Sequence, residues 1–101
     1  PNVGTKDIQY RLVAASRQDR KMSILSEVYE PRTDTGEDLL SHAGEEGGVV
    51  VEGELELTVA GKSWVLGPGD AYYFDSRLPH RFRNTGDVPA RIVSANTPPS
   101  I

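Results

Sequence analysis

The sequence contains no cysteine, and its 101 residues include only two histidines and one tryptophan. The absence of cysteine excludes a disulfide framework, a thiolate metal site and a cysteine nucleophile. It also agrees with a reducing compartment, so we expect a cytoplasmic protein. No apolar run approaches the roughly 18 residues of a membrane-spanning helix, and we therefore expect no membrane partner.

Basic residues are scarce in the centre of the chain. The formal net charge is −4, and residues 22–56 hold ten of the 15 acidic residues but only Arg32 as a basic one. An acidic centre without a basic and aromatic stripe argues against this segment binding a nucleic-acid backbone. The length fits one small domain, which needs a closed core or a partner subunit because a short chain buries little of its surface.

Glycine and proline separate short segments in which apolar and polar residues alternate. Segment 49–59 carries apolar residues at 55, 57 and 59, and after an Ala60-Gly61 turn the segment 63–66 places Trp64 and Leu66 on the side of the expected core. Residues 31–38 resemble a loop. Further strands are expected over residues 8–14, 22–30, 72–74, 80–84 and 91–95. This pattern predicts an all-β fold, a small antiparallel β-barrel or jelly roll whose closure removes exposed strand edges.

The two histidines are candidates for a metal site. His42 precedes Glu46 by four residues, and His80 opens a distant expected strand. Fully extended, His42 and Glu46 would lie about 13 Å apart, but the intervening and following glycines allow the chain to double back. Two imidazoles and one carboxylate form the facial triad that suits iron, and they also suit zinc, manganese or nickel. The alternative is that both histidines are solvated or structurally hydrogen-bonded.

Three other side chains are candidates for contact with a small ligand. Tyr72 and Phe82 alternate onto one expected strand face, where they would line a pocket in an open barrel; core packing is the alternative for Phe82. A buried phenol needs a partner for its hydroxyl group, which favours Tyr72 as a ligand contact. Arg77 is a candidate to bind an anionic ligand at the barrel mouth, because Arg81 and Arg83 are expected to point outwards.

Four stretches of the sequence resemble a known family. They are residues 48–57, Pro68-Gly69-Asp70, residues 78–84 and residues 95–100. Together they resemble the cupin superfamily of small β-barrels, and more narrowly the cupin domain that follows a helix-turn-helix in bacterial regulators of the xenobiotic-response-element type. The resemblance covers about residues 22–101, which we identify as the cupin β-barrel domain. Residues 1–21 are then a linker plus an N-terminal strand.

The first motif of this family has two histidines separated by one residue, then a glutamate four residues later and a glycine seven residues after that. His42, Glu46 and Gly53 match the second histidine, the glutamate and the glycine, whereas Leu40 stands in place of the first histidine. Leu40 is therefore a candidate contact for a bound ligand rather than for a metal.

The second motif supplies one more histidine. His80, Gly69 and Asn84 match it, whereas Asp75 replaces a proline and Arg77 replaces a glycine. The resemblance thus implies a divalent metal site that keeps three of the four family ligands, His42, Glu46 and His80. Water or a bound molecule would complete the coordination shell.

Three functions of different kinds agree with these residues. The first is a sensory domain that binds a small-molecule effector and influences DNA binding through an N-terminal domain absent from these 101 residues. The second is a free-standing metal-dependent cupin enzyme, an oxygenase or an isomerase. A dimeric storage or scaffold barrel is a third. We favour the sensor, because binding demands fewer intact ligands than turnover. A homodimer that pairs through residues 8–13 is expected in each case.

Overall fold

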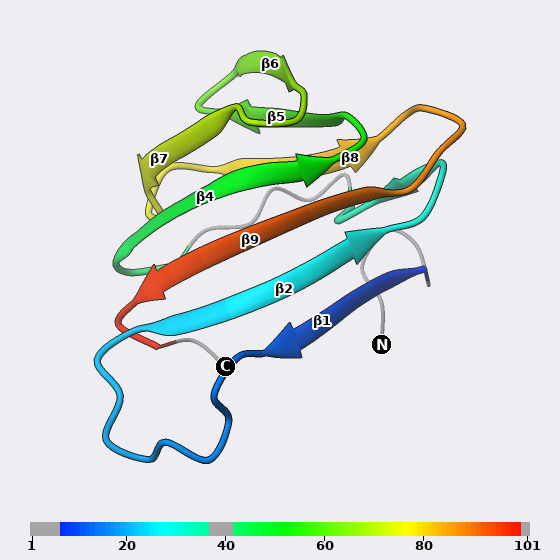
Figure 1. The fold of residues 1–101 in the computed structure, drawn as a ribbon. Coiled ribbons are helices and arrows are strands. Elements are labelled where there is room, and N and C mark those ends of the chain that lie inside the picture. Colours follow the sequence, from blue (N-terminus) through cyan, green and yellow to red (C-terminus); the bar gives the residue numbers. More distant parts are fainter. Residues whose placement is uncertain (1–6, 37–41, 100–101) are drawn as a thin grey trace.

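The computed structural model describes residues 7–36 and 42–99, and every regular element in these ranges is a β-strand (Figure 1). All strand pairs are antiparallel. The all-β antiparallel fold predicted from the alternation is therefore confirmed. Within the described residues there is no helix with the length and apolar character needed to cross a membrane.

The strands form two sheets that face each other. The five-stranded sheet has the order β1 (Ile8–Leu12), β2 (Ser23–Tyr29), β9 (Ala90–Thr97), β4 (Glu45–Glu52) and β7 (Ala71–Asp75). The four-stranded sheet has the order β3 (Thr33–Asp34), β8 (His80–Asn84), β5 (Leu55–Val59) and β6 (Lys62–Leu66). Sequence neighbours such as β4 and β5 lie in different sheets, so the chain repeatedly crosses between them, as Figure 1 shows.

Most expected strands lie within one or two residues of their observed bounds. The segment 49–59, expected as one strand, is wrong as such, because it is divided between β4 and β5 in different sheets. The region expected as a loop contains the two-residue strand β3, which pairs with β8. β1 lies in the segment expected to hold a linker and an N-terminal strand, and it is the edge strand of the five-stranded sheet. Between β4 and β5 the chain turns at Gly53, where φ is +76° and a Cβ atom would lie 2.3 Å from the Pro89 carbonyl oxygen. A side chain cannot be accommodated there.

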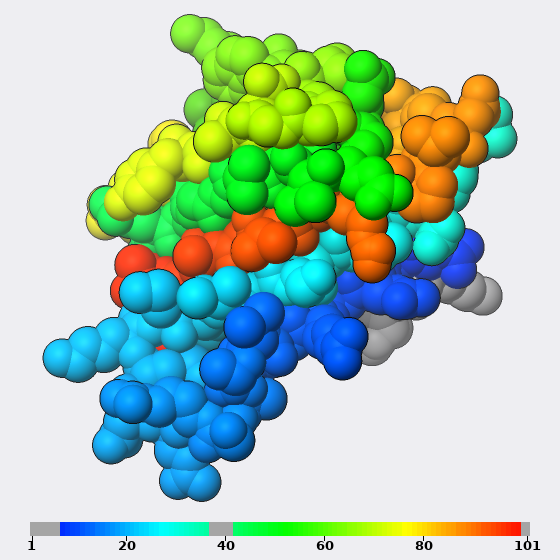
Figure 2. Space-filling view, in the orientation of Figure 1, coloured from blue at the N-terminus to red at the C-terminus, as the bar shows by residue number. Residues whose placement is uncertain are grey.

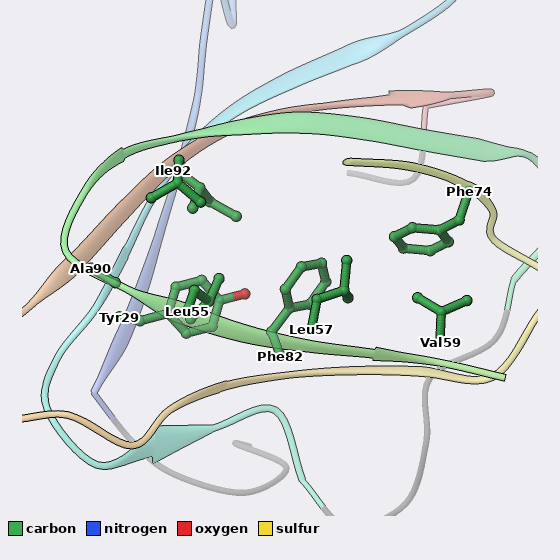
Figure 3. Close-up of a cluster of buried hydrophobic side chains, with 9 residues drawn as sticks. Tyr29, Leu55, Leu57, Val59, Phe74, Phe82, Ala90 and Ile92 are labelled. Atoms are coloured by element: carbon green, nitrogen blue, oxygen red, sulfur yellow. The ribbon is translucent and has the colours of Figure 1, made fainter. Parts of the chain in front are cut away.

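The core lies between the two sheets (Figure 3) and receives inward side chains from both. In β5 the residues at 55, 57 and 59 are buried, as their alternation predicts. The buried apolar residues are Tyr29, Val50, Leu55, Leu57, Val59, Phe74, Phe82, Ala90 and Ile92. Trp64 is not one of them and is 48% exposed, so its expected core position is wrong, and Leu66 is only partly buried. β6 is a sheet edge, and its side chains have neighbours on one side only.

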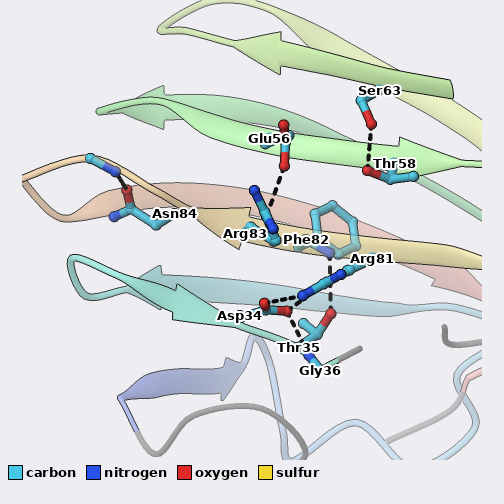
Figure 4. A network of polar contacts seen from close by, with 11 residues as sticks. Asp34, Thr35, Gly36, Glu56, Thr58, Ser63, Arg81, Phe82, Arg83 and Asn84 are labelled. Carbon is cyan, nitrogen blue, oxygen red and sulfur yellow. Dashed lines mark hydrogen bonds and ion pairs between the residues drawn. The ribbon is translucent and has the colours of Figure 1, made fainter. Parts of the chain in front are cut away.

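Polar side-chain contacts join β3 and the residues after it to the neighbouring strand β8 (Figure 4). Arg81 forms a two-pronged ion pair with Asp34, one prong of which joins Nε and Oδ1 at 2.9 Å, and this hydrogen bonding lowers the pKa of Asp34. The Phe82 N–H donates to the Thr35 hydroxyl at 3.1 Å. Arg81 and Arg83 thus point away from the core, as expected, while the intervening Phe82 points into it. The segment through Thr35 is held against the barrel.

Candidate metal centre

Three potential metal ligands from two parts of the chain converge inside the barrel. His42 lies just before β4, Glu46 lies on β4, and His80 begins β8 in the opposite sheet. Each offers a ligand atom, and these atoms all lie within 4.8 Å of one another. Bonds of about 2.0–2.2 Å to a single divalent ion require ligand atoms no more than about 4.4 Å apart, so only a small movement of these side chains is needed for all three to bind one ion. A search of the described residues for three or more potential metal ligands in close proximity finds this one group.

The backbone around residue 44 brings His42 back toward Glu46. Gly44 has a φ of +115°, and a Cβ atom there would lie 2.1 Å from the Thr97 carbonyl oxygen. The His42 N–H donates to the Ser76 carbonyl, and the Ser76 N–H donates to the Gly44 carbonyl, both at 2.9 Å. These bonds fix the approach to β4 against the end of β7. The doubling back is thus a property of one glycine and two backbone hydrogen bonds.

His80 is held in a form suited to metal binding. His80 is 1% exposed, and its Nδ1 atom lies 2.8 Å from the Leu78 carbonyl oxygen. A carbonyl only accepts, so Nδ1 carries a proton, and in the neutral ring Nε2 then keeps its lone pair. Burial lowers the pKa of His80, and the nearby His42 adds to this effect. The two imidazole rings meet edge to face, with centroids 5.3 Å apart. A neutral imidazole is the ligating form.

Glu46 is a buried carboxylate with one hydroxyl partner. Burial, together with the negative charge of Glu27, raises the pKa of Glu46 to about 7. The Tyr72 hydroxyl opposes this shift by donating to Glu46 Oε2 at 3.1 Å. No described cationic side chain forms an ion pair with Glu46. A bound cation would supply the positive charge that the carboxylate lacks.

The cluster borders a cavity of about 170 Å³ in the barrel interior. Both sheets contribute to its wall, which is formed by Tyr10, Leu25, Glu27, Tyr29, Thr35, His42, Glu46, His80, Phe82 and Asn96. Lysine and arginine are absent from this described lining. The interior therefore combines apolar rings with two carboxylates and two imidazoles.

The analysis of the sequence missed several polar residues of the cavity wall, among them Glu27 and Asn96. Glu27 is 4% exposed and accepts a hydrogen bond from the Tyr29 hydroxyl at 3.0 Å and another from the Ser94 hydroxyl. The signal that reveals it is its place in β2, where it occupies an inward position between Leu25 and Tyr29. A carboxylate on the buried face of an amphipathic strand is a candidate for an interior polar role.

The four residues predicted from the sequence to contact a ligand differ in their position relative to the cavity. Tyr72 contacts the cluster through Glu46. Phe82 lines the cavity and belongs to the core, and its contact with a ligand stays a prediction. The Arg77 side chain is 74% exposed, is paired with Asp75, and is not part of the described cavity wall. Leu40 lies outside the described residues.

Comparison with known families identifies the class of this domain. The cupin domain model matches residues 25–96, and the chain belongs to this family. The chain is also 38% identical over 96 residues to the HTH-type transcriptional regulator PuuR of Escherichia coli (strain K12). That match covers 95% of this chain and 51% of PuuR, so the chain spans about half the length of the curated relatives it matches. The resemblance to regulator cupins noted from the sequence is therefore confirmed.

Solved structures show the same fold. The Cupin_2 domain of an XRE family transcriptional regulator from Enterobacter cloacae superimposes with a TM-score of 0.80 at 22% identity, covering 91% of this chain and 97% of that chain. Ectoine synthase from P. lautus gives a TM-score of 0.77 at 23% identity, covering 97% of this chain and 69% of that one. The fold thus occurs in a regulator domain and in a protein described as an enzyme.

Proposed function

We propose that the chain is the effector-sensing domain of a bacterial helix-turn-helix transcription regulator, with a divalent metal ion held in the barrel by His42, Glu46 and His80. The observation that carries this proposal is the match to PuuR, which covers nearly the whole of this chain but only 51% of that regulator. A DNA-binding domain would occupy the other half of such a protein, which would work in the cytoplasm.

The chemistry of the donor set supports a metal ion. Two imidazole nitrogens and one carboxylate oxygen suit zinc, iron, manganese or nickel. His80 is oriented by the Leu78 carbonyl, and a hydrogen bond of this kind commonly orients a metal-binding histidine. When bound, the ion would supply a positive charge and open coordination positions for a donor atom of the effector. Tyr72 would hold Glu46 in its ligating orientation.

The cavity supports a small effector. Its volume of about 170 Å³ lies below the range of about 300–1,000 Å³ for pockets that hold drug-sized ligands. An effector that fits would contact ligands from both sheets, because His80 lies in one sheet and Glu46 in the other. Binding would thereby favour one spacing of the two sheets over another, and such a population shift is what a sensor transmits.

A metal-dependent enzyme is the second candidate. The observation that favours it is the pairing of a phenol with a carboxylate at the edge of the proposed coordination sphere, where Tyr72 and Glu46 could exchange a proton with a bound substrate. The three protein ligands would leave positions for that substrate, as catalytic metal sites do.

Adjacent glutamates provide a matched test of the metal centre. Glu46 points into the barrel, and Glu45 is exposed on the opposite face of β4. We expect the purified chain, loaded with zinc or manganese and desalted, to retain about one equivalent of metal by elemental analysis. Glu46→Gln and His80→Ala should lose it, and Glu45→Gln should keep it. Equal metal content in all variants would contradict the proposed site.

Two further measurements separate the sensor from the enzyme. A thermal-shift screen of small acids and amines tests effector binding, since a ligand at a hundred times its dissociation constant adds about 2.7 kcal/mol of apparent stability. Metal loss with retained binding of the hit supports a sensor, whereas metal loss that ends turnover of the hit supports an enzyme. The reading frame upstream of Pro1 tests the regulator directly, because a start codon immediately before Pro1 would contradict it.

A further inference from the structure

The barrel cavity has a second polar end, away from the three potential metal ligands. Glu46 on β4 is the register partner of Asn96 on β9. Glu27 on β2 is the register partner of Ile92, which lies four residues earlier on β9. Four residues correspond to about 13 Å along a strand, yet Glu46 and Glu27 both line the cavity. The cavity is therefore elongated, with the metal ligands at one end and Glu27 at the other.

Glu27 is a buried carboxylate that keeps free acceptor sites. Its Oε1 accepts a hydrogen bond from the Tyr29 hydroxyl at 3.0 Å, and its Oε2 accepts one from the Ser94 hydroxyl. An ionised carboxylate has about four lone-pair sites, so about two remain. No lysine or arginine belongs to the described cavity wall, and none of the described cationic side chains forms an ion pair with Glu27. Because buried charges in proteins are normally paired, this end of the cavity suits a cation.

The surroundings of Glu27 favour an organic cation over a second metal ion. Glu27 does not belong to the group of residues with metal-ligand spacing. Tyr10 is its register partner, and the Tyr10 ring meets the Tyr29 ring edge to face, with centroids 6.5 Å apart. The Phe82 ring centroid lies 6.1 Å from that of Tyr29. Aromatic ring faces attract organic cations, so a protonated amine suits this end of the cavity.

Asn96 is a second, independent indication of a bound molecule. It is 6% exposed and lines the cavity. Within the described part of the chain, no residue forms a hydrogen bond with its side-chain amide. A buried amide without a partner costs free energy, and buried polar groups in native proteins almost always have one. Since Asn96 is the register partner of Glu46, its amide is available to a molecule at the metal end of the cavity.

We propose that the effector is a small zwitterion, with a carboxylate at one end and a protonated primary amine at the other. This inference rests on the proposed metal centre. A divalent ion held by two neutral imidazoles and one carboxylate keeps a net positive charge, so it favours an anionic donor atom. The effector carboxylate meets the ion and accepts a hydrogen bond from the Asn96 amide. The ammonium group occupies the free acceptor sites of Glu27.

Neither a simple acid nor a simple amine satisfies both ends of the cavity. An acid leaves Glu27 without a cation, and a protonated amine has no lone pair for a metal and is repelled by its charge. The volume also limits the length of the molecule. A cavity of about 170 Å³ equals about six water molecules at about 30 Å³ each, which suits a ligand of roughly six to eight non-hydrogen atoms. Straight-chain amino acids with a terminal amine have this size and charge pattern.

The Glu27 end of the cavity is the end that reaches the surface beside β1. Figure 2 shows the outer face of the five-stranded sheet, where β2, β9 and β4 are covered without an opening. Tyr10 on β1, in contrast, lines the cavity and is 50% exposed. An effector that enters past Tyr10 presents its carboxylate to the metal end and leaves its amine beside Glu27.

Calorimetric titration of the zinc-loaded, desalted chain tests this inference. The probes are β-alanine, γ-aminobutyrate and δ-aminovalerate, and each is compared with the unsubstituted carboxylate and the unsubstituted primary amine of the same length. We expect one of the amino acids to bind at least about 10-fold more tightly than its matched acid and its matched amine, because a charge-assisted hydrogen bond is gained at each end. Elemental analysis before each titration reports the metal content.

Substitutions at the two ends of the cavity have different expected effects. Glu27→Gln should lower the affinity for the amino acid by about 10- to 100-fold and leave that for the matched acid unchanged, because only the ammonium group loses its partner. Glu27→Asp, which shortens the side chain, should act in the same direction. Asn96→Ala should weaken the amino acid and the matched acid by the same factor of about 10. Glu52→Gln is the matched control, since Glu52 is exposed on β4, and circular dichroism verifies that each variant folds.

Each end of the proposed complex has its own contradicting result. Equal affinities for the amino acid and its matched acid, or an amino-acid affinity that both Glu27 variants preserve, would overturn the role of Glu27. Tightest binding by a matched amine would overturn the carboxylate at the metal. No binding of any probe by a chain that retains its zinc would overturn the zwitterion and leave the metal centre in place. A wild-type chain without zinc in elemental analysis would overturn the metal centre, and the inference with it.

Discussion

Removal of the Tyr72 hydroxyl is the most direct perturbation of the proposed metal centre. That hydroxyl donates to Glu46 Oε2 at 3.1 Å. Tyr72→Phe deletes this donor and keeps the ring, which stacks on Phe74 with centroids 5.8 Å apart. The packing around the cavity is therefore retained, and the change acts on the orientation of one carboxylate.

The magnitude follows from the kind of bond that is lost. A hydrogen bond to a charged group contributes about 1.5–3 kcal/mol, and about 1.4 kcal/mol corresponds to a factor of ten in affinity. We expect metal affinity to fall by about 10–100-fold, the range found when an outer-shell partner of a metal ligand is removed. The assay is calorimetric titration of the metal-free chain with zinc or manganese.

Tyr73 provides the matched control. It lies next in β7, points to the opposite face, and donates its hydroxyl to Glu45. Tyr73→Phe makes the same chemical change outside the barrel and should leave metal affinity unaltered. Equal losses in both variants, or no loss in Tyr72→Phe, would refute the role given to Tyr72. A wild-type chain that binds no metal would refute the metal centre itself.

Two stability measurements complete the predictions. Burial raises the pKa of Glu27, so this carboxylate binds a proton more readily in the native protein than in the unfolded chain. The contribution of Glu27 to the free energy of unfolding should therefore increase as the pH falls from 7 toward the ordinary glutamate pKa of about 4.3. Glu27→Gln should reduce that gain in urea unfolding at pH 7 and pH 5, and an unchanged pH slope would argue against it. Phe82→Ala should cost about 3–5 kcal/mol, because a buried ring leaves a cavity. Trp64→Ala, at a site that is 48% exposed, should cost clearly less, and equal losses would contradict the assignment of the core.

Strand positions were predictable because alternation is a local property. A residue's neighbours at two positions before and after it determine whether one face is apolar, and β5 and β8 follow this pattern along their whole length. The pattern does not reveal how many neighbours a strand has in its sheet. Trp64 was therefore misplaced, since β6 has the apolar residues of a core strand but lies at an edge.

The ligand candidates were predictable only as residue types and spacings. His42 and Glu46 are four residues apart, and a glycine between them allows convergence, but the direction of each side chain depends on backbone bonds to Ser76. The pairing of Tyr72 with Glu46 follows from the register of β7 on β4, which is set by the whole sheet. Glu27 was missed because its hydrogen-bond partners lie on its own strand and on β9.

The sequence by itself determined an all-β domain, the family to which it belongs, and a short list of residues able to bind a metal. The fold class depends on alternation and the list of ligands on residue types and spacing, whereas the family depends on the resemblance of whole motifs; all of these are properties of the chain as a linear sequence. Only the tertiary structure decided that His80 meets Glu46 across the two sheets and that Glu27 shares their cavity. Each of these depends on strand order and register, which long-range pairing sets.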